Sequence, residues 1–445
     1  MTGFSPRRRP FLVGGSLLTA LVVLPGCGAP ATEPVEPPAV ASVVVPETAR
    51  SSDAVVNSIG VELKLTYLQT VYGSAFSSII KPRLIALGVR HVRDEGVTAK
   101  SDGWMSLIYG RMKELAQKGI KFNLTMRPAE GVTDFTQITQ WERFLSYALP
   151  VVEDFEGINE WDLKARSTTW PAQLRPFQQA LYAKVTTDAR TRHMPVFLPS
   201  MGNPNNASLL GDLSAWGNYG NTHPYPGGNQ PMANVAYHAT RVKVISGTRP
   251  WVVTETGYHN ALAWTGGHPP VTERAAARYI PRLFLEYFDA GIRRTYLHEL
   301  IDEGVSTSNR ELNFGLLRNN GSPKPAYTAL QNMITILKDP GPAYTMSQLG
   351  YTLGGDQTNL KRMLLQKRNG VFYLALWQAV SSYDLVAKKD LAPPARSVTV
   401  TFPAAVTQVR IFSPLTSAAA IQTIARPTTL TVSVPDSPVF VEITR

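Results

Sequence analysis

The feature that most constrains the fold is an alternation of short apolar runs with helical patterns between residues 55 and about 338. One unit has an apolar helical face over 104–115, then Gly119, then an alternating run over 120–124. A glycine directly after a helical pattern fits the left-handed position that ends many helices, and alternation with a period of two indicates a strand. The same order of helical pattern, glycine and strand recurs in this region, which predicts repeated strand–helix units.

Eight such candidate strands precede a final helical pattern over 326–337. They cover residues 58–63, 89–94, 120–126, 155–159, 196–199, 219–223, 251–254 and 293–298. That count predicts an α/β protein in which residues 54–340 form a (β/α)8 TIM barrel. The alternative is an open doubly wound sheet, but the phosphate-binding pattern Gly-x-Gly-x-x-Gly does not follow the first strand. The barrel is therefore the favoured fold.

The pattern changes after the segment Asp339-Pro340-Gly341-Pro342. Short alternating runs follow one another there, separated by Pro, Ser and Asp. Two of these runs flank Asn369-Gly370, the dipeptide most typical of a tight hairpin turn. Residues 341–445 are accordingly predicted to form a small antiparallel β-sandwich.

The N-terminus has the pattern of an export signal. Arg7-Arg8-Arg9 precedes an apolar run over 11–24, which is shorter than the ~20 residues needed to cross a bilayer. The following Leu24-Pro25-Gly26-Cys27 resembles a bacterial lipobox, in which cleavage precedes the cysteine and its sulfur is acylated. Residues 8–12 resemble a twin-arginine signal, and an ordinary charged leader is the alternative. We expect a signal peptide over 1–26 and a lipid anchor on Cys27.

Residues 27–53 are rich in proline without a helical period, so we expect a tether. The signal and the tether together predict a protein that is exported and held at the outer face of the bacterial membrane or envelope. We also expect a monomer. The single cysteine excludes an intrachain disulfide and a Cys-rich zinc site. The net charge of +11 includes three arginines of the signal peptide, leaving +8, without the dense Lys/Arg run that nucleic-acid binding needs.

Polar residues at the carboxyl ends of barrel strands are the candidates for chemistry, because the active sites of such barrels lie there. They are Arg93, Asp94 and Glu95 after the second strand, Asn159 to Asp162 after the fourth, His223 and Tyr225 after the sixth, Glu255 after the seventh, and His298 and Glu299 after the eighth. Glu160 and Glu255 can face each other across the barrel mouth. Such a pair suits glycoside hydrolysis, in which a neutral carboxylic acid protonates the leaving oxygen and a carboxylate attacks or stabilises the anomeric carbon.

These motifs resemble those of clan A retaining glycoside hydrolases, and the layout is similar to family 39, which includes β-xylosidases and endoglycosidases of exopolysaccharides. The resemblance covers residues 55–445. It is carried by Asn159-Glu160, by His223-x-Tyr225, by Thr254-Glu255-Thr256-Gly257, and by Phe314-Gly315-Leu316-Leu317 with the segment 321–327.

The resemblance implies roles for single residues. Glu160 would be the general acid/base, Glu255 the nucleophile, Asn159 a donor to the sugar 2-hydroxyl, Tyr225 and Arg93 partners of Glu255, and His223 part of the subsite. The sequence departs from the family at two places. Trp161 replaces the proline that commonly follows Asn-Glu, and the frequent tryptophan of the eighth strand is missing, with Tyr296, His298 or Glu299 nearest.

Other interpretations stay open for several side chains. Trp161, Tyr258 and Trp264 either stack on sugar faces or cap the core. Glu299 competes as a carboxylate, and a salt bridge at the rim is its alternative role. His223, His259 and His298 suggest a metal, but no His-x-His ends the first strand and no cysteine pair is present, so neither a metal nor a cofactor is expected.

The sequence therefore predicts a retaining glycosidase of envelope or extracellular saccharides, with carboxyl groups roughly 5–5.5 Å apart. A transglycosylase would use the same residues. A carbohydrate-binding lipoprotein without activity is a second class, because a fold does not fix a function. A solute receptor predicts two lobes instead of one ring. The sugar, its linkage and the choice between internal and terminal cleavage are left open.

Overall fold

The computed structural model describes residues 44–445 except residues 45 and 166. The predicted signal peptide over 1–26, the lipidation site Cys27 and most of the predicted tether therefore lie outside the described residues. Among the helices that are described, none combines the length and the apolar composition needed to cross a membrane.

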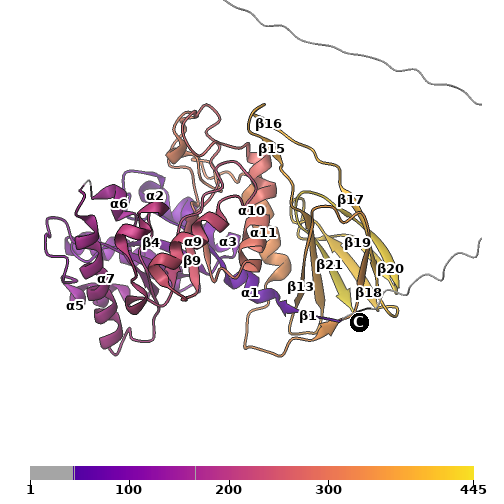
Figure 1. The fold of residues 1–445 in the computed structure, drawn as a ribbon, viewed down its shortest axis with the longest axis horizontal. Coiled ribbons are helices and arrows are strands. Elements are labelled where there is room, and N and C mark those ends of the chain that lie inside the picture. Colours follow the sequence, from indigo (N-terminus) through magenta and orange to yellow (C-terminus); the bar gives the residue numbers. More distant parts are fainter. Residues whose placement is uncertain (1–43, 45, 166) are drawn as a thin grey trace, which may run out of the picture. The chain divides into compact units, whose positions relative to one another are not determined.

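Eight parallel strands form the central sheet, in the order β7-β6-β5-β4-β3-β10-β9-β8. Two of them, β4 and β9, are labelled in Figure 1. Their bounds are β3 (Ile59–Glu62), β4 (His91–Gly96), β5 (Lys121–Met126), β6 (Val152–Glu156), β7 (Val196–Phe197), β8 (Gly220–Asn221), β9 (Trp251–Thr256) and β10 (Thr295–Leu297). The two ends of this sheet meet, since the backbone N–H of Leu198 donates to the carbonyl of Tyr219 at 2.9 Å. Each predicted strand overlaps an observed one, and the TIM barrel is confirmed.

Helical segments follow the strands along the chain. They are α1 (Ser52–Asn57), α2 (Val71–Ser74), the π-helix η1 (Phe76–Ile80), α3 (Lys81–Leu87), α4 (Asp102–Ala116), α5 (Trp141–Ala148), α6 (Trp161–Lys164), α7 (Trp170–Thr187), η2 (Pro204–Asn206), α8 (Ala207–Leu210), η3 (Ser214–Trp216), α9 (Val235–Ser246), α10 (Glu273–Asp289), η4 (Arg310–Leu312) and α11 (Pro325–Leu337). Helix α4 buries Met105, Ile108, Met112 and Leu115, the spacing of one helical face. Gly119 follows α4 with φ of +83°, the left-handed conformation that the sequence predicted.

The C-terminal strands form two antiparallel layers with an apolar core between them. The larger sheet has the order β19-β18-β21-β14-β13-β2 and the smaller one the order β12-β17-β20. The edge strand β2 (Arg50–Ser51) pairs with β13 in parallel, and all other neighbours in these two sheets are antiparallel. Their bounds are β12 (Thr352–Gly355), β13 (Leu360–Gln366), β14 (Phe372–Gln378), β17 (Arg396–Thr401), β18 (Gln408–Phe412), β19 (Ala420–Ala425), β20 (Thr429–Val434) and β21 (Val439–Thr444), beside the small pair β15 (Tyr383–Asp384) and β16 (Lys389–Asp390). The predicted hairpin at Asn369-Gly370 joins β13 to β14.

Strand β14 is buried on both faces, which couples the sandwich to the barrel. Phe372 and Leu374 belong to the core between the two C-terminal sheets. The alternate residues Tyr373 and Trp377 belong to the core that the barrel also uses, and the Trp377 indole donates to Glu286 of α10 at 2.9 Å. Side chains alternate along a strand, so one strand serves both cores.

The chain enters the C-terminal sheets before it enters the barrel, which differs from the predicted tether over 27–53. Strand β1 (Glu47–Thr48) pairs with β11 (Gln348–Leu349), and β2 (Arg50–Ser51) pairs with β13. Helix α1 begins at Ser52 and leads into β3. The partners of β1 and β2 lie about 300 residues further along the chain, so no local pattern in the sequence reveals this pairing.

Candidate active site

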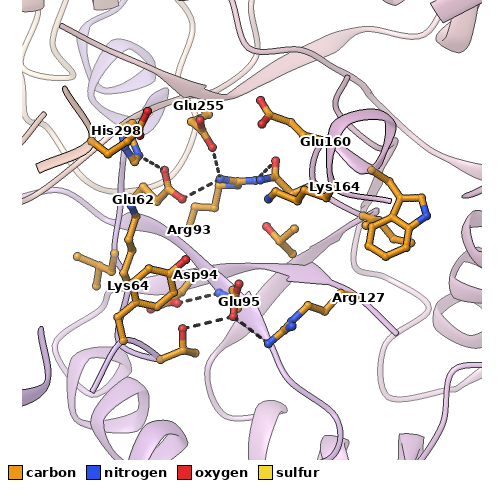
Figure 2. A pocket seen from close by; sticks show the side chains of 18 residues that line it. Glu62, Lys64, Arg93, Asp94, Glu95, Arg127, Glu160, Lys164, Glu255 and His298 are labelled. Atoms are coloured by element: carbon orange, nitrogen blue, oxygen red, sulfur yellow. Dashed lines mark hydrogen bonds and ion pairs between the residues drawn. The ribbon is translucent and has the colours of Figure 1, made fainter. Parts of the chain in front are cut away.

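A cavity of about 480 Å³ opens at the carboxyl ends of the barrel strands (Figure 2). Its lining residues come mainly from the ends of β3, β4, β5, β6 and β9. They are Glu62, Leu63, Lys64, Thr66, Tyr67, Arg93, Asp94, Glu95, Thr125, Arg127, Ile158, Asn159, Glu160, Trp161, Lys164, Glu255, His298 and Glu311. The structure thus brings Arg93, Asn159, Glu160, Glu255 and His298 together, as the strand-end argument predicted.

Glu255 is held by donors on both carboxylate oxygens. The Tyr225 hydroxyl donates to Oε1 at 2.6 Å, and Arg93 Nη1 donates to Oε2 at 3.1 Å. Burial raises the pKa of Glu255, but the positive charges of His223, His298 and Arg93 and the hydrogen bond from Tyr225 outweigh it and hold that pKa well below its usual range. Glu255 is therefore ionised, as a nucleophile must be.

Glu160 lies in an unusual backbone conformation, with φ of +49° at the residue before α6. Side-chain-bearing residues seldom adopt this region, and its cost of about 1 kcal/mol or more is typical of functional sites. Its N–H donates to the carbonyl of Ser200 at 3.2 Å, and its Oε1 lies 2.9 Å from His223 Nδ1. The chain thus turns sharply after β6 and presents this carboxyl group to the cavity.

The carboxyl groups of Glu160 and Glu255 are close to each other. One oxygen of each, together with a ring nitrogen of His223, forms a set in which all atoms lie within 4.8 Å of one another. Burial lowers the pKa of His223, but the negative charges of Glu255 and Glu160 raise it by more. The imidazole therefore binds its proton more strongly than a free imidazole does, and it lies between the two carboxyl groups.

Arg93 is the buried cation around which the acidic residues gather. Its Nε and Nη2 donate to Glu156 at 2.9 Å each, and its Nη1 donates to Glu62 at 3.0 Å as well as to Glu255. Its Nη2 also donates to Asn159 Oδ1 at 3.1 Å. Because Arg93 holds the amide oxygen of Asn159, the NH2 of that side chain remains a donor for a ligand.

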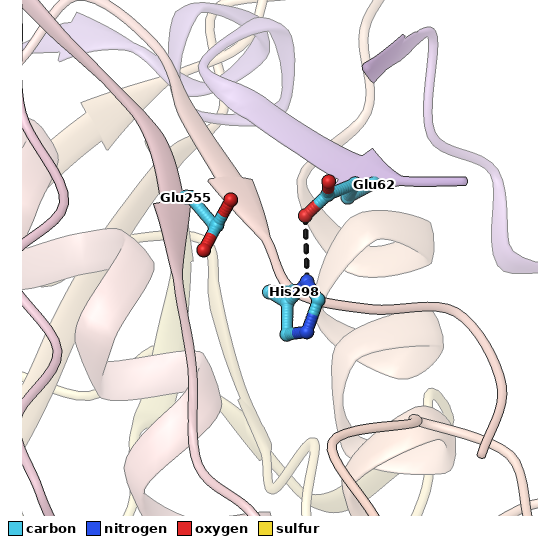
Figure 3. A group of neighbouring side chains, drawn as sticks. All are labelled: Glu62, Glu255 and His298. Atoms are coloured by element: carbon cyan, nitrogen blue, oxygen red, sulfur yellow. Dashed lines mark hydrogen bonds and ion pairs between the residues drawn. The ribbon is translucent and has the colours of Figure 1, made fainter. Parts of the chain in front are cut away.

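Glu62 is a residue of the site that the sequence analysis missed. It ends β3 and accepts from His298 Nδ1 at 2.6 Å (Figure 3). The available signal was its place at the end of the first strand, an end that the strand-end argument did not use. His298, one of the three residues nearest to the missing tryptophan of the eighth strand, thus forms a polar pair with Glu62 at the cavity wall.

This pair makes stability depend on alkaline pH. Burial lowers the pKa of His298, but the charge of Glu62 and its hydrogen bond outweigh this and raise the pKa from 6.5 to about 9. A group whose pKa is raised in the folded state stabilises the fold. This stabilisation is fully present below the unfolded pKa of 6.5 and is lost as the pH rises through the folded pKa of about 9. We expect the free energy of unfolding, measured by urea denaturation, to fall between pH 6.5 and 9 in the wild type. His298→Asn should flatten that decline, and an unchanged slope would contradict the charged pair.

The cavity lining does not include the predicted residues Tyr258, Tyr296 and Glu299. The Tyr258 hydroxyl donates to the carbonyl of Asn229, and its ring stacks on Tyr279 in the core. Tyr296 is fully buried on β10. Glu299 accepts from the Tyr72 hydroxyl at 2.9 Å. It also forms an ion pair with Lys64, with 3.9 Å between Oε1 and Nζ, which is the alternative role that the sequence predicted.

The predicted tryptophans have different surroundings. Trp161 lines the cavity, and its indole donates to Gln173 at 2.9 Å. The indole of Trp264 donates to the carbonyl of Gly267, and the guanidinium of Arg310 lies 5.6 Å from its ring. Only Trp161 of the two is therefore in reach of a ligand in this cavity.

Two clusters among the described residues have the composition of a metal site. They are Glu62, Glu255 and His298, and Glu160, His223 and Glu255. Both include Glu255, whose Oε2 accepts from Arg93. The guanidinium of Arg93 supplies the positive charge beside Glu62 and Glu255 that a metal ion would otherwise supply.

Replacing Tyr225 tests its hydrogen bond to Glu255. We expect Tyr225→Phe to lower kcat for a glycoside about 10- to 100-fold, since a hydrogen bond to a charged group is worth about 1.5–3 kcal/mol. Losing the donor raises the pKa of Glu255, so the acid limb of kcat/KM should move to higher pH. Tyr237→Phe, at an exposed tyrosine of α9, is the matched control. A reduced kcat with an unmoved limb would show that Tyr225 does not act through Glu255.

The sequence matches no family model and no curated protein sequence. Solved structures do match. A family 39 glycoside hydrolase from Bacteroides cellulosilyticus has a TM-score of 0.58 at 16% identity, covering 89% of this chain and 81% of that one. A family 39 β-xylosidase from Caulobacter crescentus has a TM-score of 0.53 at 14% identity, covering 90% and 98%.

The chain has the fold of family 39 glycoside hydrolases. A glucosidase from Croceicoccus marinus shares the fold too, with a TM-score of 0.62 at 11% identity over 90% of this chain and 97% of that one. The predicted resemblance in architecture is therefore confirmed, and the chemistry rests on this chain's own residues.

Proposed function

We propose that the protein is a retaining glycoside hydrolase in which Glu160 is the general acid/base and Glu255 the nucleophile. The observation that carries this proposal is the short separation of their carboxyl groups, because an oxygen of Glu160 lies within 4.8 Å of an oxygen of Glu255. Retaining enzymes hold this pair about 5–5.5 Å apart, whereas inverting enzymes leave about 6.5–9.5 Å for a water molecule.

In the first step, a carboxylate oxygen of Glu255 attacks the anomeric carbon. The bond from that carbon to the glycosidic oxygen breaks, and the proton of Glu160 goes to the leaving oxygen. Arg93 and Tyr225 hold Glu255 in position, and the Asn159 amide is placed to donate to a sugar hydroxyl. The product of this step is a glycosyl ester of Glu255.

In the second step, water attacks the anomeric carbon of the ester while the carboxylate of Glu160 takes its proton. The ester bond to Glu255 breaks, which restores one carboxylate and one carboxylic acid. An acceptor sugar in place of water would give transglycosylation by the same residues. The substrate in either case is a saccharide, and the predicted lipid anchor on Cys27 would place the reaction at the cell envelope.

Glu160→Gly tests the role of the acid/base. Glycine tolerates the positive φ at this position, so the backbone is not strained by the change. We expect about 10²–10⁴-fold slower cleavage of sugar–sugar bonds but a near-normal first step on dinitrophenyl glycosides, whose leaving group needs no proton. Azide should then restore turnover and yield a glycosyl azide of retained configuration. Equal losses on both substrate types would contradict the role.

A screen of soluble glycans separates catalysis from the second candidate, a carbohydrate-binding protein without activity. The proposal expects cleavage by the wild type, with retained anomeric configuration in the first product seen by NMR. Binding without cleavage of any glycan would favour the second candidate. A product of inverted configuration would contradict the assignment of Glu255 as the nucleophile.

A further inference from the structure

A second cavity adjoins the first at the two glutamates. It has a volume of about 290 Å³ and is lined by Leu163, Gly202, Pro204, His223, Tyr225, His238, His268, Arg310 and Phe314. Glu160, Glu255 and Glu311 line both cavities. The carboxyl pair therefore stands at the junction of two hollows and not at the bottom of one.

Each hollow can take part of a saccharide chain. Small-molecule sites have volumes of about 300–1,000 Å³, and the two cavities measure about 480 and 290 Å³. Asn159, the candidate donor to the sugar 2-hydroxyl, lines only the first cavity. The first cavity thus belongs to the sugar that is attacked, and the second to the part that leaves.

Both cavities have exposed side chains in their lining. In Figure 2, Arg127 and Glu95 lie on the other side of Arg93 from Glu160 and Glu255. The side chain of Arg127 is 49% exposed, and Tyr67 in the same wall is 37% exposed. Leu163 in the wall of the second cavity is 56% exposed. Each of the two cavities therefore has exposed side chains in its lining as well as the buried groups around the carboxyl pair.

We propose that the two cavities are halves of one cleft that binds a polysaccharide on both sides of the bond to be cleaved, so that the protein cuts inside chains. A protein that removes terminal sugars needs a wall that closes the cavity beyond the attacked sugar, whereas Tyr67 and Arg127 in the lining of the first cavity are exposed. Tyr67 offers a ring face to a more distant sugar, and Leu163 offers an apolar contact on the leaving side. The inference rests on the proposed hydrolase function.

The test follows product sizes from xylan, β-1,3-glucan, galactomannan and alginate. For each polysaccharide that the wild type cleaves, viscosity should fall early and oligosaccharides of mixed length should appear first. Nitrophenyl glycosides of single sugars should be cleaved poorly, because they leave the far end of the first cavity empty. Release of only mono- or disaccharides from one end would overturn the inference and leave the hydrolase function standing. Cleavage of no glycan by the wild type would overturn both.

Two variants connect the product pattern to the cavities. On hexasaccharides labelled at the reducing end, Tyr67→Ala and Leu163→Ala should each change the ratio of bonds cut by about three- to tenfold, the loss of one contact to a bound sugar. The control is Leu107→Ala, an exposed leucine of α4 outside both cavities. Bond ratios equal to those of the control in both variants would contradict the assignment of the two cavities.

Discussion

Glu255→Gln should lower kcat by about 10⁴-fold or more, the largest effect on activity that the structure predicts. The amide has nearly the shape of the carboxylate but cannot form the glycosyl ester. The glutamine side chain has one acceptor oxygen where the glutamate has two, so it cannot accept hydrogen bonds from Tyr225 and Arg93 on separate oxygens and loses its fixed orientation. The measurement is the initial rate on the glycan found in the screen, with circular dichroism to verify the fold.

The control for this variant is Glu114→Gln, a change of the same chemistry in an exposed residue that pairs with Lys81. It should keep the wild-type rate. The smaller variant Glu255→Gly leaves room for azide, which should attack the sugar from the side of the missing carboxylate and give an azide of inverted configuration. Residual activity of Glu255→Gln within about tenfold of wild type would mean that another group is the nucleophile.

Arg93→Leu should have the largest effect on stability. It leaves Glu62, Glu156 and Glu255 without the buried guanidinium that all three contact. Removing one partner of a buried ion pair costs about 3–5 kcal/mol, because the opposite charge stays buried and uncompensated. We expect this loss in the free energy of unfolding at pH 7, measured by urea denaturation.

The pH dependence of that loss identifies its cause. Arg93 lowers the pKa values of Glu62 and Glu255, so these two values rise in the folded state of the variant, and a raised carboxyl pKa makes the fold relatively more stable as the pH falls. The deficit of Arg93→Leu relative to wild type should therefore shrink between pH 7 and 5. Arg190→Leu, which breaks an exposed ion pair with Glu142, should cost less than about 1 kcal/mol. A deficit of Arg93→Leu independent of pH would indicate lost packing alone.

The sequence predicted the barrel well because its signals are local. The eight strands are short apolar runs bounded by turns, and glycines such as Gly119 end the helices where they were expected. The pairing of β1 with β11 joins residues about 300 positions apart, and no local pattern in the sequence predicts it. Long-range partners of short strands therefore needed the structure.

The candidate site was predictable as a set of strand ends but not as a set of contacts. Glu62 was overlooked, although it contacts both Arg93 and His298. Tyr296 was a candidate because it is one of the residues nearest to the tryptophan missing from the eighth strand, yet it is fully buried in a position where its ring fills the space beside Gly60. The sequence gives a residue's place along a strand, whereas its neighbours across the barrel decide whether it reaches a ligand.

The central claim is that Glu255 forms a covalent bond with the sugar. It is tested most directly by incubating the protein with an activated 2-deoxy-2-fluoro glycoside of the sugar found in the screen, and then mapping the labelled peptide by mass spectrometry. The fluorine slows the second step, so the ester accumulates. The account predicts one sugar per chain, attached to Glu255 and absent in Glu255→Gln. A label on Glu160 or Glu62, or turnover with inversion and no label, would contradict it.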